Sequence, residues 1–256
     1  MEPDDNSGAT RAARQQQLAH ARLMWILSPP EDVGDAGTPP ARAWLEKVAP
    51  ALPEVDAVQV RPKARPASPT RPRAAPSFAV TEARASLEWT RAVLAAVAGL
   101  DPTRRPLVLV NDRIDVARAL QAEGVDGAHV GDGDVPPRVA RDVLGPDALL
   151  GLSTHGARDL VRALDEPIDM VGFGPVFATG TKGYDGSRGP ALVGPDGAWI
   201  AQESSPLPVF PIGGIDLANV DELERAGRAA VATAISAAPD PARAARALRE
   251  ALVPVR

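Results

Sequence analysis

The sequence predicts an α/β protein that folds as a single (β/α)8 TIM barrel with a short N-terminal helical extension. Three observations lead to this fold class. The chain has 256 residues, a length that suits one barrel domain. Eight short apolar or β-branched runs recur along it, and most gaps between them carry a helical pattern. Strands that alternate with helices form parallel sheets, and eight such units close naturally into a barrel.

The expected strands all follow residue 22, and they are the runs 24–27, 57–60, 107–110, 127–130, 149–152, 170–173, 209–212 and 229–233. Apolar residues at i, i+3 and i+4 predict helices over 116–122, 139–144, 157–164, 220–226 and 241–252. Gly124, Gly145 and Gly227 follow helix ends, where a left-handed cap is favoured. An open doubly wound sheet is the structural alternative.

Residues 1–22 are interpreted as an N-terminal tail with a leading helix over 10–22, and residues 23–256 as the barrel domain. Two stretches interrupt the regular alternation. Residues 61–81 are rich in Arg and Pro and predict a long loop. Residues 178–197 are rich in Gly, Thr, Lys and Pro, and this composition after an apolar strand is typical of an active-site lid.

Composition and charge exclude several classes of protein. The formal net charge is −5, which argues against general nucleic-acid binding. The chain has no Cys, so disulfides, thiolate metal sites and cysteine catalysis are excluded. No apolar run approaches the length of a membrane span, and the N-terminus lacks a signal-peptide pattern, so we expect a cytoplasmic protein without a membrane partner. The sequence leaves homo-oligomer formation open.

Polar or glycine residues follow nearly every expected strand. Because the active sites of barrel enzymes form at the carboxyl ends of the strands, these residues are expected to converge there. They are Arg61, Lys63, Asn111, Asp112, Asp132, Asp134, Ser153, Thr154, His155, Thr179, Thr181, Lys182, Gly213, Gly214 and Thr233.

The first expected site binds a metal and a phosphate. Asp112 and Asp134 follow neighbouring strands, and Mg²⁺ commonly takes one or two carboxylates together with substrate phosphates. Three cations on the same rim complete a phosphate clamp, and they are Arg61, Lys63 and Lys182. In the alternative reading, the two aspartates only cap the helices that follow them.

Gly213 and Gly214 indicate a second anion site. Glycine lets a ligand approach the backbone, and barrels often bind phosphate after strands seven and eight. Thr233 and Ala234 lie at the end of the eighth strand, although a Gly-Gly pair alone is usually a turn. His129 lies within a strand and is read as a histidine of the barrel interior. His155 lies at a strand end, where it is a candidate for acting on a substrate proton.

Six segments resemble the thiamine phosphate synthases, whose superfamily also includes the thiazole tautomerases. In chain order they read VQVRPK, VNDRIDVA, GAHVGDGD, GLSTH, GFGPVFATGTKG and PIGGI, and the resemblance extends over residues 24–252. It implies a barrel that joins hydroxymethylpyrimidine diphosphate to hydroxyethylthiazole phosphate and releases pyrophosphate and thiamine phosphate. The reaction would pass through a pyrimidine-methyl cation that the thiazole nitrogen captures.

The resemblance also implies roles for single residues. Arg61, Lys63, Asn111 and Lys182 would hold the pyrophosphate, Asp112 and Asp134 would bind Mg²⁺, and Ser153 would contact the pyrimidine. Thr179, Thr181, Gly214 and the backbone near Ala232 and Thr233 would hold the thiazole phosphate. The motifs further assign Gln59 and Gly213 to substrate binding and His155 to the catalytic set.

The chain also departs from the family pattern. Asp132 replaces the usual Gln and adds a negative charge beside the pyrimidine site, and Thr233 replaces Ser but keeps the hydroxyl. The segment 27–30 lacks the usual polar ending, the Arg/Pro-rich insertion is long, and the lid continues without the common Pro-rich run. A thiazole tautomerase that uses His155 is therefore the nearest rival function. A non-catalytic barrel that binds a phosphorylated precursor is the third.

Overall fold

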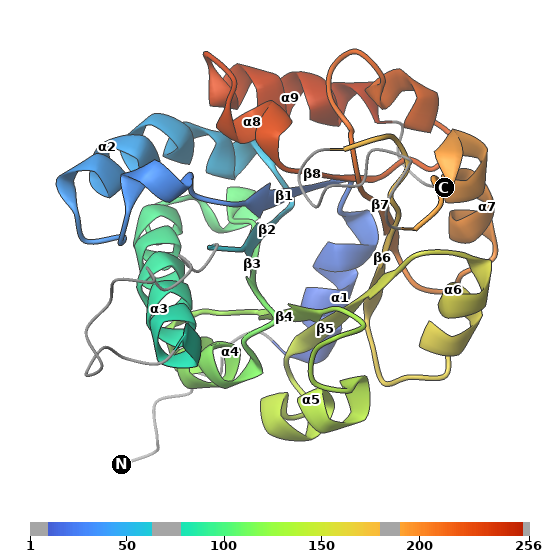
Figure 1. Cartoon of the computed structure of the whole chain (residues 1–256), viewed down its shortest axis with the longest axis horizontal. Coiled ribbons are helices and arrows are strands. Elements are labelled where there is room, and N and C mark those ends of the chain that lie inside the picture. The colour runs from blue at the N-terminus through green and yellow to red at the C-terminus, as the bar shows by residue number, and fades with distance from the viewer. Residues whose placement is uncertain (1–9, 63–77, 180–189, 253–256) are drawn as a thin grey trace.

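The computed structural model describes residues 10–62, 78–179 and 190–252. Eight parallel strands form one sheet in the order β7-β6-β5-β4-β3-β2-β1-β8, and a bridge between Ile212 and Ala230 joins its two ends. This closed ring confirms the barrel and excludes the open doubly wound sheet (Figure 1). The strands are β1 Leu23–Leu27, β2 Ala57–Val60, β3 Leu107–Asn111, β4 Gly127–Val130, β5 Leu149–Thr154, β6 Met170–Phe173, β7 Val209–Pro211 and β8 Ala229–Val231.

Helices surround this ring of strands (Figure 1). They are α1 Arg11–His20, α2 Pro39–Val48, α3 Phe78–Val97, α4 Ile114–Leu120, α5 Pro137–Leu144, α6 Ala157–Ala163, α7 Gly194–Glu203, α8 Thr233–Ser236 and α9 Pro241–Ala251. Short 3-10 turns occupy η1 Glu31–Val33, η2 Ala49–Glu54, η3 Pro102–Arg104, η4 Gln121–Glu123 and η5 Val220–Leu223. The N-terminal helical extension predicted from composition is α1.

Several predicted boundaries were wrong. The helix expected over 220–226 is the single 3-10 turn η5, and the eighth strand ends at Val231 because α8 begins at Thr233. The loop expected over 61–81 ends sooner, since α3 begins at Phe78, and α7 begins within the expected lid. Gly124 adopts the predicted left-handed cap, but Gly145 has φ 80° and ψ −179°, which is not a left-handed helical conformation.

Alternation along the strands separates the core into two layers. Outward-facing residues such as Val58, Val108 and Val171 pack with the surrounding helices. Inward-facing residues form a second cluster inside the ring, which contains Leu18, Ala21, Met24, Ile26, Ala57, Leu107, Leu109, Leu149, Met170, Phe210 and Ala230. The barrel interior is therefore a packed apolar core at the amino-terminal ends of the strands.

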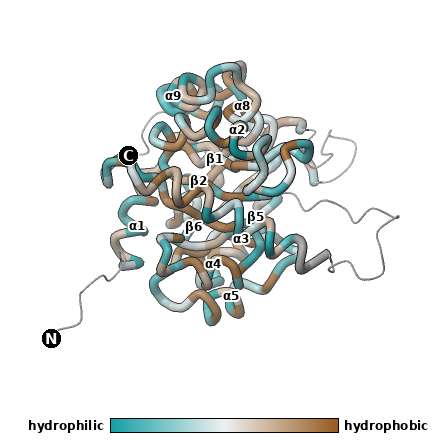
Figure 2. Tube along the Cα trace, turned by 90° about the vertical axis from the view of Figure 1, so that its left-hand side faces the viewer, coloured by the Kyte–Doolittle hydropathy of each residue, from teal (hydrophilic) through white to brown (hydrophobic). Residues whose placement is uncertain are grey.

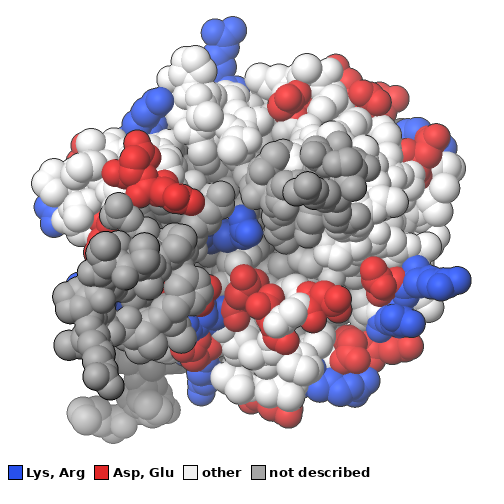
Figure 3. All heavy atoms as spheres, viewed as in Figure 1, with Lys and Arg blue, Asp and Glu red and all other residues white. Residues whose placement is uncertain are grey.

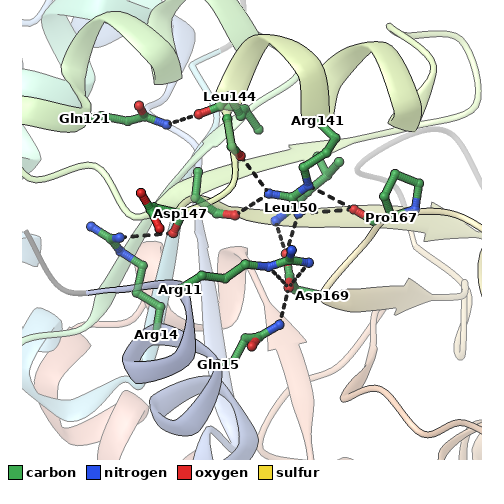
Figure 4. Close-up of polar contacts among 12 residues, drawn as sticks. Arg11, Arg14, Gln15, Gln121, Arg141, Leu144, Asp147, Leu150, Pro167 and Asp169 are labelled. Atoms are coloured by element: carbon green, nitrogen blue, oxygen red, sulfur yellow. Dashed lines mark hydrogen bonds and ion pairs between the residues drawn. The ribbon is translucent and has the colours of Figure 1, made fainter.

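Helix α1 closes the amino-terminal end of this interior. Leu18 and Ala21 are both 1% exposed and belong to the inner cluster. Polar side chains on the same helix reach the base of the barrel wall. Arg14 pairs with Asp126 at 3.0 Å. Arg11 and Gln15 both donate to Asp169 (Figure 4). Figure 2 shows α1 at one side of the molecule, with the strands beside it. The helix therefore covers the amino-terminal opening of the barrel.

An aspartate immediately precedes three of the even-numbered strands, and each carboxylate ties two strands together. Asp56 accepts the N–H of Leu23 at 3.0 Å, which joins β2 to β1. Asp126 accepts from Val108 on β3, and Asp169 accepts from Leu150 on β5, at 2.9 and 2.8 Å. Before β8 the position is Arg228, whose partner Gln202 accepts the N–H of Val209 on β7. The aspartate thus recurs before β2, β4 and β6, and an Arg–Gln pair replaces it before β8.

Candidate active site

One cavity of about 760 Å³ opens at the carboxyl ends of the strands. Apolar interior residues line part of it, among them Met24, Ile26, Met170 and Phe210. The predicted site residues that line it are Gln59, Arg61, Asn111, Ser153, Thr154, His155, Thr179, Gly213, Gly214, Ala232 and Thr233. Lys63, Thr181 and Lys182 lie outside the described residues. Figure 3 shows basic side chains near the middle of one face with acidic side chains beside them.

Asn111 ends β3 and is oriented by Gln59 on the neighbouring strand β2. The Gln59 side-chain amide donates to the Asn111 carbonyl oxygen, and Gln59 itself is buried. This bond leaves the Asn111 NH₂ group to serve as a donor elsewhere. Arg61 lies two residues after Gln59, is half-buried, and has its backbone N–H fixed by the carbonyl of Leu27 at 2.8 Å. Hydrogen-bond donors from both residues are thus available at this side of the cavity.

Asp112 has a positive φ of 59°, and among the described residues it is the one non-glycine with this conformation. Its N–H donates to the carbonyl of His129 at 2.8 Å, and its own carbonyl accepts from Ile114. Residues in this backbone region are held there by their surroundings, and they cluster at functional sites. The bend turns the chain sharply at the carboxyl end of β3.

Asp134 closes a turn after β4. Its Oδ2 accepts the N–H of Gly131 at 2.7 Å, and its backbone N–H donates to the Gly131 carbonyl. The helix-cap reading of the two aspartates was wrong: α4 has Arg113 at its N-cap and α5 has Pro136, and neither cap makes a side-chain capping bond.

Asp112 and Asp134 supply the kind of oxygen ligand that Mg²⁺ prefers. Both follow neighbouring strands, because Asn111 pairs with His129 in the β3–β4 register. Neither lines the cavity, and the described residues contain no group of three or more His, Asp or Glu side chains able to hold a metal. Two carboxylates without a closed cage leave coordination positions for phosphate oxygens and water, which is the usual arrangement for Mg²⁺.

Histidines line the cavity on β4 and after β5. His129 is 7% exposed, as expected for the barrel interior, and its Nε2 lies 3.0 Å from Ser153 Oγ. His155 Nδ1 lies 2.7 Å from the carbonyl oxygen of Gly174, which can only accept, so Nδ1 carries the proton. This bond fixes the orientation of the His155 ring beside the cavity.

The glycine pair after β7 packs against the segment that follows β6. Gly213 and Gly214 have φ values of 107° and 65°. A Cβ on Gly213 would lie 2.7 Å from Pro175, and one on Gly214 would lie 2.5 Å from the carbonyl oxygen of Ala178. Phe177 donates its N–H to the carbonyl of Gly213 at 3.0 Å. The two glycines are thus required by close backbone packing, and they hold the segment that brings Thr179 to the cavity.

The cavity has two polar sides. Asn111 on β3 and the glycine pair after β7 are four strands apart in an eight-stranded ring, so they face each other across it. Sequence reasoning did not single out Asp216, Gly174 or Pro175, which also line the cavity. The position of this carboxylate two residues after the glycine pair was the available signal for Asp216.

Residues 35–237 match the family model for thiamine monophosphate synthase. The chain belongs to this family. It is 40% identical to the thiamine-phosphate synthase of Azorhizobium caulinodans over 168 residues, 65% of this chain and 74% of that protein. It is 47% identical to that of Thermosynechococcus vestitus over 144 residues, 56% of this chain and only 39% of that protein. The second match thus covers well under half of that relative.

Solved structures share the barrel fold of this chain. Thiamine phosphate pyrophosphorylase from Pyrococcus furiosus superposes with a TM-score of 0.66 and 24% identity, covering 93% of this chain and 97% of that one. A 3-hexulose-6-phosphate synthase superposes with a TM-score of 0.57 and 18% identity, covering 91% and 100%. At these identities the likeness shows a shared barrel. None of the described helices is long and apolar enough to cross a membrane.

Proposed function

We propose that this thiamine monophosphate synthase family member condenses hydroxymethylpyrimidine diphosphate with hydroxyethylthiazole phosphate to form thiamine phosphate and pyrophosphate. The observation that carries the proposal is one cavity with groups able to bind anions on two facing sides. Arg61 and Asn111 line one side, and the Gly213–Gly214 backbone lines the other. Two substrates that each carry phosphate need such a pair of sites around one reaction centre. The curated relatives named above are thiamine-phosphate synthases.

The pyrophosphate site is proposed at the ends of β2 and β3. Arg61 and the Asn111 amide would donate to phosphate oxygens, with Lys63 and Lys182 as additional cations. Asp112 and Asp134 would hold Mg²⁺, which when bound neutralises negative charge on the leaving pyrophosphate. Donors fixed before the reaction, as Asn111 is by Gln59, stabilise developing charge without having to reorganise.

The thiazole phosphate site is proposed opposite, at the ends of β7 and β8. Gly213, Gly214, Ala232 and Thr233 line the cavity there, and their backbone N–H groups would donate to the phosphate. Bare backbone amides bind anions well because no side chain keeps the ligand away. Thr179 and Thr181 would add hydroxyl donors from the segment after β6.

The proposed reaction breaks the bond between the pyrimidine methylene carbon and the pyrophosphate oxygen, which leaves with the electron pair. The thiazole nitrogen then donates its lone pair to the carbocation and forms the new C–N bond. Ser153 would contact the pyrimidine, and His155 would complete the polar wall beside it. The apolar residues Met170 and Phe210 line the same cavity and limit the water that would otherwise trap the cation.

A thiazole tautomerase is the second candidate, and one observation favours it. His155 lines the cavity, and the bond from its Nδ1–H to the Gly174 carbonyl holds the imidazole there. A base at this position is able to move a proton on a bound thiazole. This activity needs neither the pyrophosphate cations nor Mg²⁺.

One assay separates the two functions. The purified chain is incubated with the pyrimidine diphosphate, the thiazole phosphate and Mg²⁺, and released pyrophosphate and thiamine phosphate are measured. We expect both products in equal amounts, and none after chelation of the metal. Conversion of the thiazole tautomer without pyrophosphate release would instead establish the isomerase.

A further inference from the structure

His129 has no role in the site proposed above, yet its position is tightly defined. It lies on β4, is 7% exposed and lines the cavity. Its Nε2 is 3.0 Å from Oγ of Ser153 on β5, within hydrogen-bond distance. A buried imidazole that lines the cavity and lies within hydrogen-bond distance of the Ser153 hydroxyl requires an explanation beyond packing.

Two neighbouring strands leave space for the His129 ring. A Cβ on Gly151 of β5 would lie 2.3 Å from Nδ1, and one on Gly172 of β6 would lie 3.2 Å from Cε1 and Nε2. Both glycines are in strands, where glycine is unfavourable because it loses more conformational entropy than other residues. The absence of both side chains lets the ring pack directly against the β5 and β6 backbones. The two glycines therefore leave the room that the ring occupies.

His129 also connects the two halves of the pyrimidine diphosphate site. Its residue partners in the sheet are Asn111 on β3 and Gly151 on β5. Its backbone carbonyl accepts the N–H of Asp112 at 2.8 Å, and its side chain reaches Ser153. His129 thus contacts both Asp112, the proposed metal ligand, and Ser153, which is proposed to contact the pyrimidine.

We propose that His129 is a positioning residue that fixes the Ser153 hydroxyl toward the pyrimidine ring. Nε2–H donates to Ser153 Oγ, which leaves the hydroxyl proton of Ser153 for an acceptor in the cavity. A nitrogen of a neutral heteroaromatic ring is the acceptor that this geometry suits. The inference rests on the proposed condensation, and it adds a residue that acts through Ser153 without itself contacting the substrate.

Two substitutions separate this role from simple space filling. His129→Leu fills the space between the strands but cannot donate a hydrogen bond. His129→Gln retains an N–H donor on a side chain of similar reach. If the ring only filled space, the apolar substitution would be tolerated at least as well as the polar one, because the position is buried.

The decisive test is a double-mutant cycle with Ser153→Ala, read as kcat and KM for pyrophosphate release. We expect His129→Leu to lower kcat about 10- to 100-fold, because small misplacements of a positioned group have effects of this size. His129→Gln should recover a substantial part of that loss. In the Ser153→Ala background, His129→Leu should change kcat by less than about twofold, since the two residues act as one unit. Thermal unfolding of each variant checks that the fold is intact.

An equal loss from His129→Leu in both backgrounds would overturn the inference, and so would a His129→Gln variant no better than His129→Leu. Failure of the proposed function would give a different result, because the unmodified chain would then release no pyrophosphate.

A substitution at Gly151 tests the position of the His129 ring without altering the histidine itself. Gly151→Ala should lower kcat in the normal background and have no further effect in Ser153→Ala, because the new Cβ displaces the His129 ring. Gly99→Ala is the matched control, since a Cβ there would meet no atom within 4 Å. A Gly151→Ala loss that persists undiminished in Ser153→Ala would contradict the proposal.

Discussion

At the scale of single residues, the strained backbone at Asp112 sets apart the end of β3. A left-handed conformation costs an ordinary side chain about 1–2 kcal/mol, whereas glycine adopts it freely and Asp or Asn is tolerated. The chain accepts φ 59° here because the Asp112 N–H bonds to His129. The conformation directs the residue after Asn111 away from the regular strand path.

Substitutions at Asp112 separate this strain from metal binding. Asp112→Ala and Asp112→Gly both remove the carboxylate, so we expect each to lower Mg²⁺-dependent pyrophosphate release by about 10²- to 10³-fold. Asp112→Ala should also unfold at lower urea than Asp112→Gly, with a stability difference of about 1 kcal/mol. Full activity in either variant would refute the metal site, and equal stability of the two would refute the strain.

Gly214 offers a test of the second anion site. Gly214→Ala places a Cβ 2.5 Å from a backbone oxygen at φ 65°, so we expect a loss of stability of about 1–3 kcal/mol. Because the displaced segment carries Thr179, KM for the thiazole phosphate should rise more than KM for the pyrimidine diphosphate. Steady-state kinetics with each substrate varied in turn measure this. Gly37→Ala, where a Cβ meets nothing within 4 Å, is the control.

At the scale of elements, α1 is attached to the barrel by buried charge as well as by apolar contact. The Asp169 side chain is fully buried and pairs with Arg11 and Arg141, while it also accepts the N–H of Leu150. Burial lowers the pKa of the Arg141 guanidinium, while the nearby Asp169 carboxylate acts in the opposite direction. The carboxylate therefore compensates a buried cation that would otherwise be unpaired.

Removing that charge should destabilise the whole barrel. Asp169→Asn leaves Arg141 buried without its counter-charge, and breaking a buried ion pair from one side costs about 3–5 kcal/mol. Urea unfolding followed by far-UV circular dichroism measures the change. Glu88→Gln removes the exposed Arg84–Glu88 pair on α3 and should cost less than about 0.5 kcal/mol. Similar effects of the two substitutions would contradict the role given to Asp169.

At the scale of the whole molecule, Glu54 joins distant parts of the chain. It bonds Arg246 on α9 and Arg104 on η3. The hydrogen bond from Arg246 is the largest cause that holds the pKa of the Glu54 carboxyl below its usual value of 4.5. Because the pKa is lower in the folded state, the stabilisation is present above pH 4.5 and is lost as the pH falls through the folded-state value.

The predicted pH dependence is measured with Glu54→Gln. Both arginine partners are more than half exposed, so we expect the variant to be less stable by under about 1 kcal/mol at pH 7. The difference from the unmodified chain should shrink as the unfolding measurements move well below pH 4.5. A difference that is constant with pH would show that Glu54 acts by packing and not by charge.

The sequence by itself determined the repeating pattern and the residues at the strand ends. β2, β4 and β6 begin and end where the apolar runs predicted, because buried parallel strands are continuous apolar segments with polar residues after them. The family motifs lie at those same ends, so much of the polar lining of the cavity was predicted, whereas its apolar lining was not. Local sequence patterns predicted the type and bounds of elements less well where the helical segments are short, as at η5 and α8.

Only the tertiary structure decided what depends on neighbours distant in sequence. Composition predicted the helix α1 but not its position beneath the barrel, which follows from pairing Arg14 and Arg11 with aspartates more than 100 residues away. Likewise Gly151 reads as an ordinary strand glycine until the ring of His129 is seen packed against it. Sequence patterns record which face a residue occupies, whereas closure of the barrel determines what lies opposite that face.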